Sequence, residues 1–518
     1  MINPHVRLTD LLDDVARRSP DRIAFSDTRT SVTYAELGRA VRRVAAELAA
    51  RGIVRGDRVA TYAPKQYENV VLLLAANLAG AIFVPINPQL KDHQVLHILK
   101  DSGARALASN AQRLKRMAAV QDLPGLATWS IDELDTTGAT GGAADPRPVS
   151  VIDDDPAAIL YTSGSTGRPK GVTLSHRNLV SGADSVASYQ QLASDDVILG
   201  VLPLSFDAGL SQLTTALAAG ACYAPLDFIQ PAEVPRHCEQ HGVTSITGVP
   251  PLWTQIASVA WPEATAARIR RIANTGGHMP APLLARLQKL YPAARPYLMY
   301  GLTEAFRSTF LPPEQVAIRP GSIGKAVPNA EILVVRADGT PCDADEPGEL
   351  VHRGAFVTLG YWNDPELTAV RFRPLPSVHA EIPRADRAVW SGDIVRRDAE
   401  GYLYFVARGD DMIKASGYRV SPTEVEEILL TCPEVIEAAA FGVAHPALGQ
   451  AIVVSVQSLA TAEACRDAVL RACKQRLPSY MVPSHVDVVA AALPRNPNGK
   501  IDRSALKQQH ADLFAAES

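Results

Sequence analysis

Residues 161–172 combine three glycines, four Ser/Thr residues and one lysine in twelve positions. Glycine has no Cβ, so backbone N–H groups can approach an oxyanion closely, and the hydroxyl groups can donate to phosphate oxygens. A lysine supplies the opposite charge. The stretch therefore predicts a phosphate-binding loop, formed by Thr162, Ser163, Gly164, Ser165, Thr166, Gly167 and Lys170.

This loop differs from a Walker A loop because no Gly-Lys-Ser/Thr ends it and its lysine follows a proline. An ordinary Ser/Gly surface turn is the alternative interpretation. The apolar residues 157–161 predict a buried strand before the loop, and a helix is predicted to begin near Ser175. The loop then lies at a strand end, where α/β sheets bind ligands.

Polar residues also follow other predicted strands. The strand 196–203 leads to Asp207, a carboxylate within apolar sequence that is either a buried anion or a helix N-cap. Strands 243–249, 269–275 and 296–300 follow, and the last two run into Asn274-Thr-Gly-Gly277 and Tyr300-Gly-Leu-Thr-Glu304. Glycine beside hydroxyl groups at neighbouring strand ends is typical of a nucleotide-binding crevice.

The elements around these residues predict an α/β fold. Thr33 to Glu36 has the form of a capping box before a helix that Gly52 ends, and strand 57–64, helix 70–78 and strand 82–86 alternate as in a layered parallel sheet. Residues 136–148 form an irregular connection. Residues 321–404 are hairpin-like and predict a small β subdomain, and the last part of the chain predicts an α+β domain with helix 422–430, strands near 441–443 and 451–457, and helix 462–475.

The composition limits the classes of partner and the cellular compartment that are expected for this chain. The chain has 518 residues, 20% charged residues, a net charge of -4 and a pI near 6.3, which argue against a nucleic-acid partner. The N-terminus lacks an apolar signal segment, and the uncharged stretch 69–90 is broken by Gly80 and Pro85, so neither secretion nor a membrane span is expected. The six scattered cysteines predict reduced thiols in a cytoplasmic protein and no zinc site.

Five motifs together resemble the core motifs of the AMP-forming adenylating superfamily, which comprises acyl-CoA synthetases, adenylation domains of nonribosomal peptide synthetases and firefly luciferase. They are the phosphate loop, Tyr300-Gly-Leu-Thr-Glu304, Ser391-Gly-Asp393, Arg408-Gly-Asp-Asp-Met-Ile-Lys414 with Gly417-Tyr-Arg419, and Pro494-Arg-Asn-Pro-Asn-Gly-Lys500. Their order and spacing match the superfamily, and the resemblance covers residues 8–505. It is closest in look to bacterial acyl-CoA ligases associated with exosortase loci.

The resemblance implies a two-step reaction with ATP and Mg²⁺. A carboxylate attacks the α-phosphorus of ATP to give an acyl-adenylate and pyrophosphate, and a thiol then displaces AMP. Lys500 is expected to stabilise the first transition state. The other implied nucleotide residues are Glu304 on the metal side, Gly301 and Thr303 beside it, Tyr300 against adenine, and Asp393 with Arg408 on the ribose.

The resemblance also divides the chain into a large N-terminal domain of layered α/β subdomains, residues 1–408, and a mobile α+β domain, residues 409–518. Asp410 would be the hinge about which the second domain rotates between the two steps. Lys414 would then serve the thioester step, and Gly417 would line the tunnel for the thiol arm. Ala407 stands where relatives usually have glycine.

The resemblance also extends to the pocket for the acid. Residues 202–213 resemble the Phe-Asp motif of amino-acid-activating domains, in which the Asp pairs with the substrate's ammonium group. A small acid is expected, with an amino acid among the candidates. Arg307 would face an acidic group of the substrate, or lie at the surface with Glu304 or solvent. The pocket positions implied by the motifs are Asp207, Ala208, Ser211, Gly248, Ala273, Thr275, Met299, Arg307 and Ser308.

The thiol acceptor is left open between coenzyme A and the phosphopantetheine of a separate acyl or peptidyl carrier protein, since no carrier domain follows Lys500. Two other functions compete with an acid–thiol ligase. One is an adenylate-forming enzyme that transfers its acyl group to a non-thiol acceptor, and the other is an inactive nucleotide-binding scaffold. The presence of both Lys414 and Lys500 argues against the scaffold, because each would act in a different step.

Overall fold

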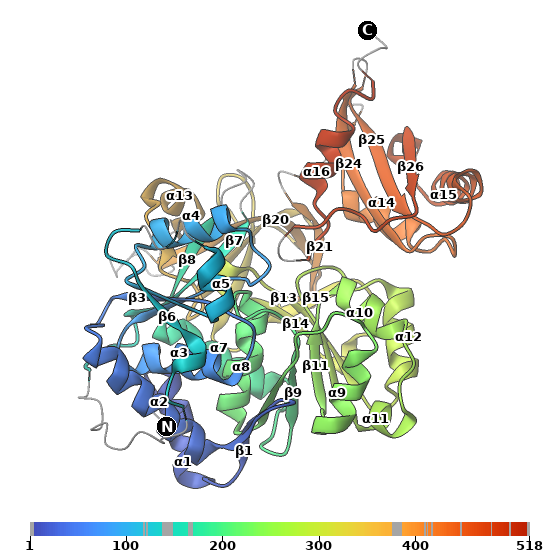
Figure 1. Cartoon of the computed structure of the whole chain (residues 1–518). Coiled ribbons are helices and arrows are strands. Elements are labelled where there is room, and N and C mark those ends of the chain that lie inside the picture. The colour runs from blue at the N-terminus through green and yellow to red at the C-terminus, as the bar shows by residue number, and fades with distance from the viewer. Residues whose placement is uncertain are drawn as a thin grey trace.

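The computed structural model describes residues 5–117, 120, 123–136, 149–163, 169–375, 386–408, 411, 413–415, 418–445, 448–477, 479–496 and 499–514. The chain forms an α/β structure with three sheets (Figure 1). Two sheets and most helices build a large N-terminal body. The third sheet belongs to a smaller C-terminal unit that stands on one side of this body.

The first sheet has seven strands in the order β18-β8-β7-β4-β3-β5-β6, and the phosphate loop connects the antiparallel pair β7 and β8. The strands from β7 to β6 run parallel to one another. The predicted strands 57–64, 82–86 and 157–161 are therefore confirmed. The bounds are β3 Arg58–Tyr62, β4 Ile82–Pro85, β5 Ala106–Ser109, β6 Ala127–Ser130, β7 Pro156–Ser163, β8 Pro169–Ser175 and β18 Gly360–Tyr361.

Helices between the two large sheets share one apolar core with both of them. The predicted capping box is confirmed, because the Thr33 hydroxyl accepts from the Glu36 N–H at 3.2 Å and Glu36 Oε2 accepts from the Thr33 N–H at 2.7 Å. The helices of this region are α1 Leu8–Arg18, α2 Tyr34–Ala50, α3 Tyr67–Leu78, α7 His176–Tyr189 and α8 Asp207–Ala219, with the short turn η1 Ile131–Glu133. Two further helices, α4 Asp92–Ser102 and α5 Ala111–Arg116, pack against the first sheet in a separate apolar core.

The second sheet has fourteen strands. Its centre is the parallel run β10-β9-β11-β12-β13, and β14 and β15 connect this run to the antiparallel hairpins predicted within residues 321–404. The strands are β1 Ile23–Ser26, β2 Ser31–Thr33, β9 Val197–Gly200, β10 Cys222–Pro225, β11 Ser245–Gly248, β12 Arg271–Asn274, β13 Arg295–Tyr300, β14 Thr309–Leu311, β15 Ser322–Ala326, β16 Ala330–Val335, β17 Gly348–Gly354, β19 Phe372–Leu375, β20 Asp386–Arg397 and β21 Leu403–Arg408.

Helices on the outer face of the parallel run enclose a second apolar core with Trp253 at its centre (Figure 1). They are α9 Glu233–His241, α10 Pro250–Ala257, α11 Glu263–Arg268 and α12 Ala281–Leu290. The single turns η2 Thr303–Ala305 and η3 Pro313–Gln315 and the helix α13 Pro365–Arg371 complete the N-terminal body.

The C-terminal unit is a five-stranded sheet covered by helices, where the sequence predicted only two strands and two helices. It has apolar cores of its own, distinct from those of the N-terminal body. The bounds are β22 Ile413–Ala415, β23 Tyr418–Val420, α14 Pro422–Leu429, β24 Glu437–His445, β25 Gly449–Gln457, α15 Ala462–Arg476, η4 Ser479–Met481, β26 His485–Val489 and α16 Arg503–Gln509.

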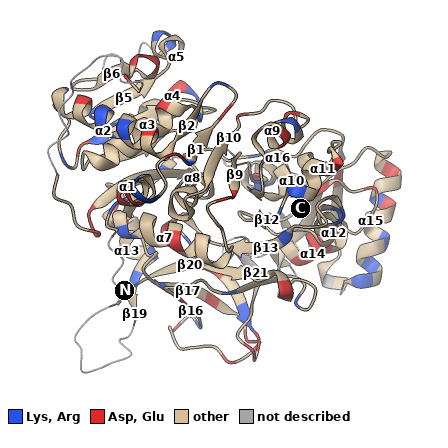
Figure 2. Cartoon of the chain, turned by 90° about the horizontal axis from the view of Figure 1, so that it is seen from below, with Lys and Arg blue, Asp and Glu red and all other residues tan. Residues whose placement is uncertain are grey.

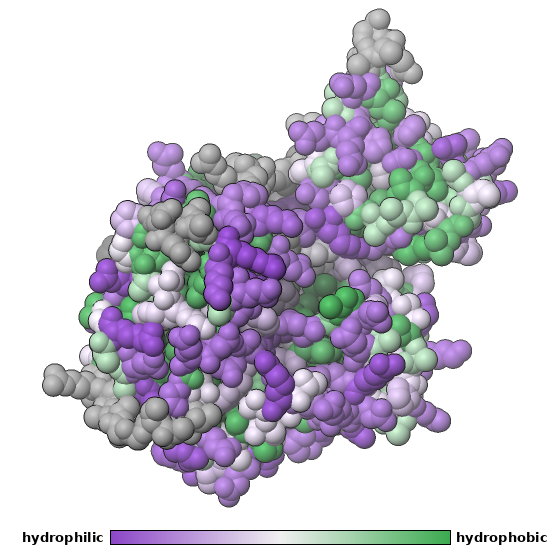
Figure 3. Space-filling view, viewed as in Figure 1, coloured by the Kyte–Doolittle hydropathy of each residue, from purple (hydrophilic) through white to green (hydrophobic). Residues whose placement is uncertain are grey.

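The two units meet above the carboxyl ends of the parallel strands. His278, four residues after β12, lies 3.5 Å from Glu427 of α14, and the Ser421 hydroxyl donates to the Val406 carbonyl. A hollow lined partly by hydrophobic residues lies below the C-terminal unit (Figure 3). Acidic and basic residues alternate over the helices in Figure 2. Within the described residues, no helix is long and apolar enough to cross a membrane.

Candidate active site

The phosphate loop leaves the first sheet between β7 and β8. Thr162 and Lys170 are partners across these two strands. The Thr162 hydroxyl and the Lys170 ammonium group therefore belong to the same end of the hairpin. Gly164, Ser165, Thr166 and Gly167 lie outside the described residues, as does the side chain of Ser163. The described ends of the loop therefore agree with the predicted position at a strand end.

Glu304 contacts β18, the strand that pairs with β8 after the phosphate loop. Its Oε1 accepts a 2.5 Å hydrogen bond from the Tyr361 hydroxyl, and Tyr361 pairs with Val172 of β8. Burial, followed by the negative charge of Glu304, raises the pKa of Tyr361, so the phenol remains a donor. Thr303 and Gly301 precede Glu304 at the end of β13. The sequence contained no pattern that marked Tyr361, which is 57 residues away.

Mg²⁺ fits Glu304 as one oxygen ligand. Among the described residues, no three His, Cys, Asp or Glu side chains gather to form a complete protein cage. Magnesium commonly takes one or two carboxylates and completes its shell with phosphate oxygens and water. Bound there, it would supply positive charge to the phosphate oxygens.

Asp393 and Tyr300, which the sequence assigned to the nucleotide, contact each other directly. The Tyr300 hydroxyl donates to Asp393 Oδ2 at 2.5 Å, and Arg408 Nε lies 3.5 Å from Oδ1. Asp393 Oδ1 is buried and accepts no hydrogen bond from the described residues. Burial raises the pKa of Asp393, against the lowering effect of Arg408. A buried acceptor with an open position suits a ribose hydroxyl, which is the group that the sequence assigned to Asp393 and Arg408.

A cavity enclosing about 550 Å³, including its open mouth, lies between α7, α8 and the ends of β11 to β14. Six predicted pocket residues line it: Asp207, Ala208, Ser211, Thr275, Met299 and Arg307. Gly248 lies at the end of β11, where an added Cβ would approach Trp253 to 2.9 Å. Ala273 and Ser308 are buried nearby, and neither is part of the lining.

Asp207 is held at the first turn of α8 by a close backbone contact. A Cβ on Gly209 would lie 1.9 Å from the Pro203 carbonyl oxygen, so only glycine lets the loop 203–206 fold onto the helix. Asp207 Oδ1 accepts from the Ala208 N–H at 2.8 Å, at the positive end of the helix dipole. Burial raises the pKa of Asp207, and the charges of Arg307 and Lys500 oppose this shift. Asp207 is thus a buried anion, whereas Phe206 occupies the N-cap position.

Arg307 is the countercharge of Asp207. Its Nη1 lies 3.7 Å from Asp207 Oδ2, and its Nη2 donates to the Asp207 carbonyl at 3.3 Å. The Arg307 side chain is only 11% exposed, which contradicts a surface arginine that pairs with Glu304 or solvent. Its Nη1 also donates to the carbonyl of Phe306, whose φ of +34° is unusual for a residue with a side chain.

The far end of the cavity contains residues that the sequence did not identify. The Tyr189 hydroxyl and the Gln190 amide both approach Met299 Sδ, at 2.9 Å and 3.4 Å. Thr215 lines the cavity one turn beyond Ser211, and their hydroxyls lie 3.3 Å apart. The i, i+4 spacing from Asp207 through Ser211 would have identified Thr215, because these positions share one helix face.

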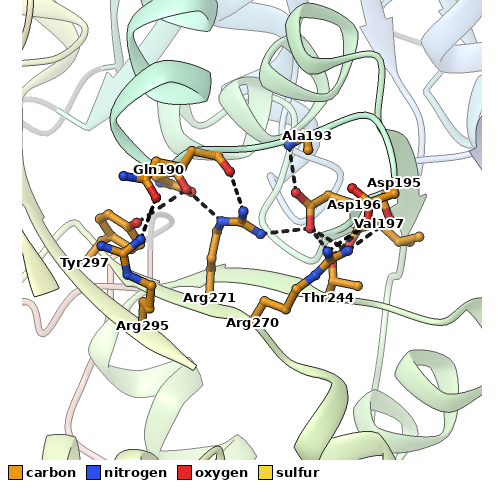
Figure 4. Close-up of polar contacts among 11 residues, drawn as sticks. Gln190, Ala193, Asp195, Asp196, Val197, Thr244, Arg270, Arg271, Arg295 and Tyr297 are labelled. Carbon is orange, nitrogen blue, oxygen red and sulfur yellow. Dashed lines mark hydrogen bonds and ion pairs between the residues drawn. The ribbon is translucent and has the colours of Figure 1, made fainter. Parts of the chain in front are cut away.

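A buried ionic network holds this far end in place (Figure 4). Arg271 donates to the Gln190 carbonyl at 2.6 Å and pairs with Asp196 at 2.8 Å. The Asp196 side chain has no exposed surface and also accepts from Thr244 at 2.7 Å and from the Ala193 N–H at 2.8 Å. Since Gln190 lines the cavity, the network positions the pocket as well as the end of α7.

Lys500 enters the site from the C-terminal unit. A hairpin turn presents it: the Lys500 N–H donates to Asn496 Oδ1 at 3.1 Å, and Gly499 has a φ of +78°. Its Cε lies 3.7 Å from the position that a Cβ on Gly276 would occupy. Lys500 is exposed to solvent, and the partial desolvation caused by the protein around it lowers the pKa of its ammonium group.

The charges of three acidic residues act on Lys500. Asp207 contributes the largest opposing effect on its pKa, and Asp393 and Glu304 act in the same direction. Asp207 lines the acid cavity, whereas Asp393 is a residue that the sequence assigned to the nucleotide. Carboxylates of both predicted substrate regions therefore act electrostatically on the ammonium group.

The residues of the second step are only partly described. Asp410 and Gly417 lie outside the described residues, as does the side chain of Lys414, which stands in β22 opposite Arg419. Their roles remain predictions.

A low pKa of Lys500 should be visible in the pH dependence of the first step. The ammonium form stabilises the transition state, so the rate falls as pH rises through its pKa, which is below the usual 10.5. In Lys500→Arg the alkaline limb of kcat/KM for pyrophosphate exchange should move to higher pH, because a guanidinium stays protonated. An unchanged limb in this variant would assign the titration to another group.

Comparison with known proteins agrees with this geometry. The model of the AMP-binding enzyme family matches residues 12–362, and the model of its C-terminal domain matches residues 424–500. Feruloyl-CoA synthase of an Amycolatopsis species is 34% identical over 503 residues, 95% of this chain and 97% of that protein. L-proline--[L-prolyl-carrier protein] ligase of Pseudomonas fluorescens is 31% identical over 95% of this chain and 97% of that protein.

Comparison with solved structures also identifies ligases as similar proteins. ATP-bound MatB from Rhodopseudomonas palustris matches with a TM-score of 0.87 and 28% identity, over 98% of this chain and 99% of that chain. O-succinylbenzoate coenzyme A synthetase from Bacillus subtilis, in complex with ATP and magnesium ion, matches with a TM-score of 0.81 and 29% identity, over 96% and 99%. The chain therefore belongs to the AMP-binding enzyme family, and it is an AMP-forming ligase.

Proposed function

We propose that this AMP-forming acid–thiol ligase activates a small carboxylic acid with ATP and transfers the acyl group to the thiol of coenzyme A or of a carrier protein's phosphopantetheine. The position of Lys500 carries the proposal. Its Cε lies 3.7 Å from the position of a Cβ on Gly276, and the charges of Asp207, Asp393 and Glu304 act on its ammonium group, which suits a place where a carboxylate and an α-phosphate would meet. This arrangement suits the adenylation step.

Each remaining residue has a proposed part in that step. Lys170 and the loop hydroxyls bind phosphate oxygens, and Glu304 faces the magnesium side. Asp393 and Arg408 hold the ribose, and Tyr300 orients Asp393 and lies against the base. Donors that are fixed before the reaction stabilise developing charge without reorganising, which is the main source of such rate enhancement.

The thioester step is proposed to follow a rotation of residues 409–518 about Asp410. Lys500 would leave the site, and the face with Lys414 and Gly417 would replace it. Domain rotation between steps is a known way for one chain to assemble two sites in turn. The relatives include both CoA ligases and a carrier-protein ligase, so both acceptors are candidates.

The six buried free cysteines accord with the predicted cytoplasmic location.

An amino acid as substrate gains little from this pocket. At about 4 Å and an effective dielectric constant near 20, one charge pair is worth about 4 kcal/mol. An ammonium group near Asp207 would gain energy of this order and lose a comparable amount to Arg307. The pair Asp207–Arg307 therefore provides no net anchor for a positive group.

Substrate-dependent ATP–pyrophosphate exchange tests the function. The panel comprises amino acids, dicarboxylic acids and unsubstituted and hydroxylated acids of two to eight carbons, and Asp207→Ala is measured beside the unchanged protein. Exchange with short acids, followed by thioester formation on addition of coenzyme A or phosphopantetheinylated carrier protein, is expected. Exchange without any thioester would favour the non-thiol acceptor, and ATP binding without exchange for any acid would favour the scaffold.

A further inference from the structure

Asp207 and Arg307 face the acid cavity as an ion pair whose charged atoms do not form a hydrogen bond. Their side chains are 9% and 11% exposed, and Oδ2 lies 3.7 Å from Nη1, beyond hydrogen-bond distance. Arg307 is fixed by the carbonyls of Phe306 and Asp207, and Asp207 is fixed by the Ala208 N–H. Because both side chains are anchored, each can also bind a third polar group that enters the cavity.

The pair lies near the reacting end of the acid. Asp207 is the acidic residue with the largest effect on Lys500, and Phe206 and Lys500 both approach Gly276. Lys500 bridges the activated carboxyl in the proposed first step. A substituent on carbon 2 or carbon 3 of the acid would therefore face Asp207 and Arg307.

The two charges select the chemistry of that substituent. A methyl group would cover two buried charges without a hydrogen bond, which is unfavourable. An ammonium group is attracted by Asp207 and repelled by Arg307, and a carboxylate meets the opposite combination. A hydroxyl group is neutral, donates to Asp207 and accepts from Arg307, so it satisfies both partners.

The rest of the cavity is lined by both polar and apolar side chains. The hydroxyls of Ser211, Thr215 and Thr275 belong to its lining, and so do the side chains of Val186, Leu192 and Ile198. Tyr189 and Gln190 contact Met299 Sδ within the same lining. The three hydroxyls offer further hydrogen-bonding positions to an acid with polar character.

We propose that the substrate is a short hydroxy acid, with its hydroxyl on carbon 2 or carbon 3 bound between Asp207 and Arg307. The inference rests on the proposed function and defines its substrate class. Arg307 is thereby a specificity-determining residue. Its guanidinium discriminates against amino acids of the same length.

Butanoate and its derivatives with a hydroxyl, amino or carboxyl group on carbon 2 or carbon 3 test this choice in pyrophosphate exchange: butanoate, 2- and 3-hydroxybutanoate, 2- and 3-aminobutanoate, ethylmalonate and methylsuccinate. We expect one hydroxybutanoate to exceed all unsubstituted, amino and dicarboxylic acids at least tenfold in kcat/KM. An amino acid or butanoate that equals the better hydroxy acid overturns the inference, although it leaves the ligase function intact.

Two variants separate specificity from structure. Arg307→Met removes the charge that repels an ammonium group from Asp207 and should shift the preference to the aminobutanoates, whereas Asp207→Asn should shift it to the dicarboxylic acids. Arg286→Met, on the exposed face of α12, is the matched control and should keep the hydroxy preference. A parallel loss for every acid in both site variants, without a shift in preference, contradicts the assigned roles.

Binding separates the inference from the ligase function. Stable sulfamoyl-adenosine analogues that carry the hydroxybutanoyl, aminobutanoyl or butanoyl group require no turnover, and calorimetry measures their affinities. If the protein catalyses no exchange, at least tenfold tighter binding of a hydroxyacyl analogue still supports the substrate class. Equal affinities of all three analogues overturn it.

Discussion

Replacing Lys500 with alanine is expected to slow ATP–pyrophosphate exchange by about 10²–10³-fold, the usual effect of removing one fixed donor to developing charge. The charges of Asp207, Asp393 and Glu304 act on the ammonium group, and without it no positive charge of Lys500 would offset them as the reacting centre becomes more negative. The affinity for ATP should change little, because Lys500 contributes mainly in the transition state.

The partial reactions give the decisive measurement. Lys500→Ala should still transfer the acyl group from a supplied acyl-adenylate to the thiol, whereas Lys414→Ala should lose this transfer and retain exchange. Lys474→Ala, an exposed position on α15, is the control and should affect neither step. Equal exchange rates in Lys500→Ala and the unchanged protein would contradict the role of Lys500.

Local sequence signals predicted most elements of the fold. The capping box at Thr33 and Glu36 is confirmed because its hydrogen bonds join residues three positions apart. The strands before Asp207, Thr275 and Tyr300 are confirmed for the same reason, since apolar runs and glycine positions are local. In the C-terminal unit, β22, β23 and β26 were missed because three to five residues carry too little periodicity.

The contacts of the site that the sequence could not identify join residues far apart in the chain. Arg307 pairs with Asp207, 100 residues away, and Tyr361 donates to Glu304 across 57 residues. Motif resemblance located Asp207 and Glu304 but contained no information on which side chain satisfies each carboxylate. That information depends on the register of β13, β14 and β18 in the folded sheets.

The second large effect is expected at the ionic network of Asp196 and Arg271, which lies beneath the acid cavity. In Asp196→Ala, we expect the N-terminal body to lose about 3–5 kcal/mol of unfolding free energy, the usual effect of removing one partner of a buried ion pair. Arg271, 11% exposed, would keep its charge without its carboxylate partner. Because Arg271 also binds the Gln190 carbonyl, the KM for the acid should rise even where the variant is folded.

The neighbouring residue supplies a matched control. Arg270 pairs with Asp196 at 3.0 Å and with Asp195 at 2.8 Å. The Asp195 side chain is 66% exposed, so Asp195→Ala should cost less than about 1 kcal/mol. The thermal unfolding midpoint and the KM for the acid, measured for both variants with saturating ATP, separate the two positions. If the two alanine variants unfold at the same temperature, the buried network does not stabilise this end of α7. If only the midpoint falls in Asp196→Ala and the KM stays constant, the network stabilises the fold without positioning the pocket.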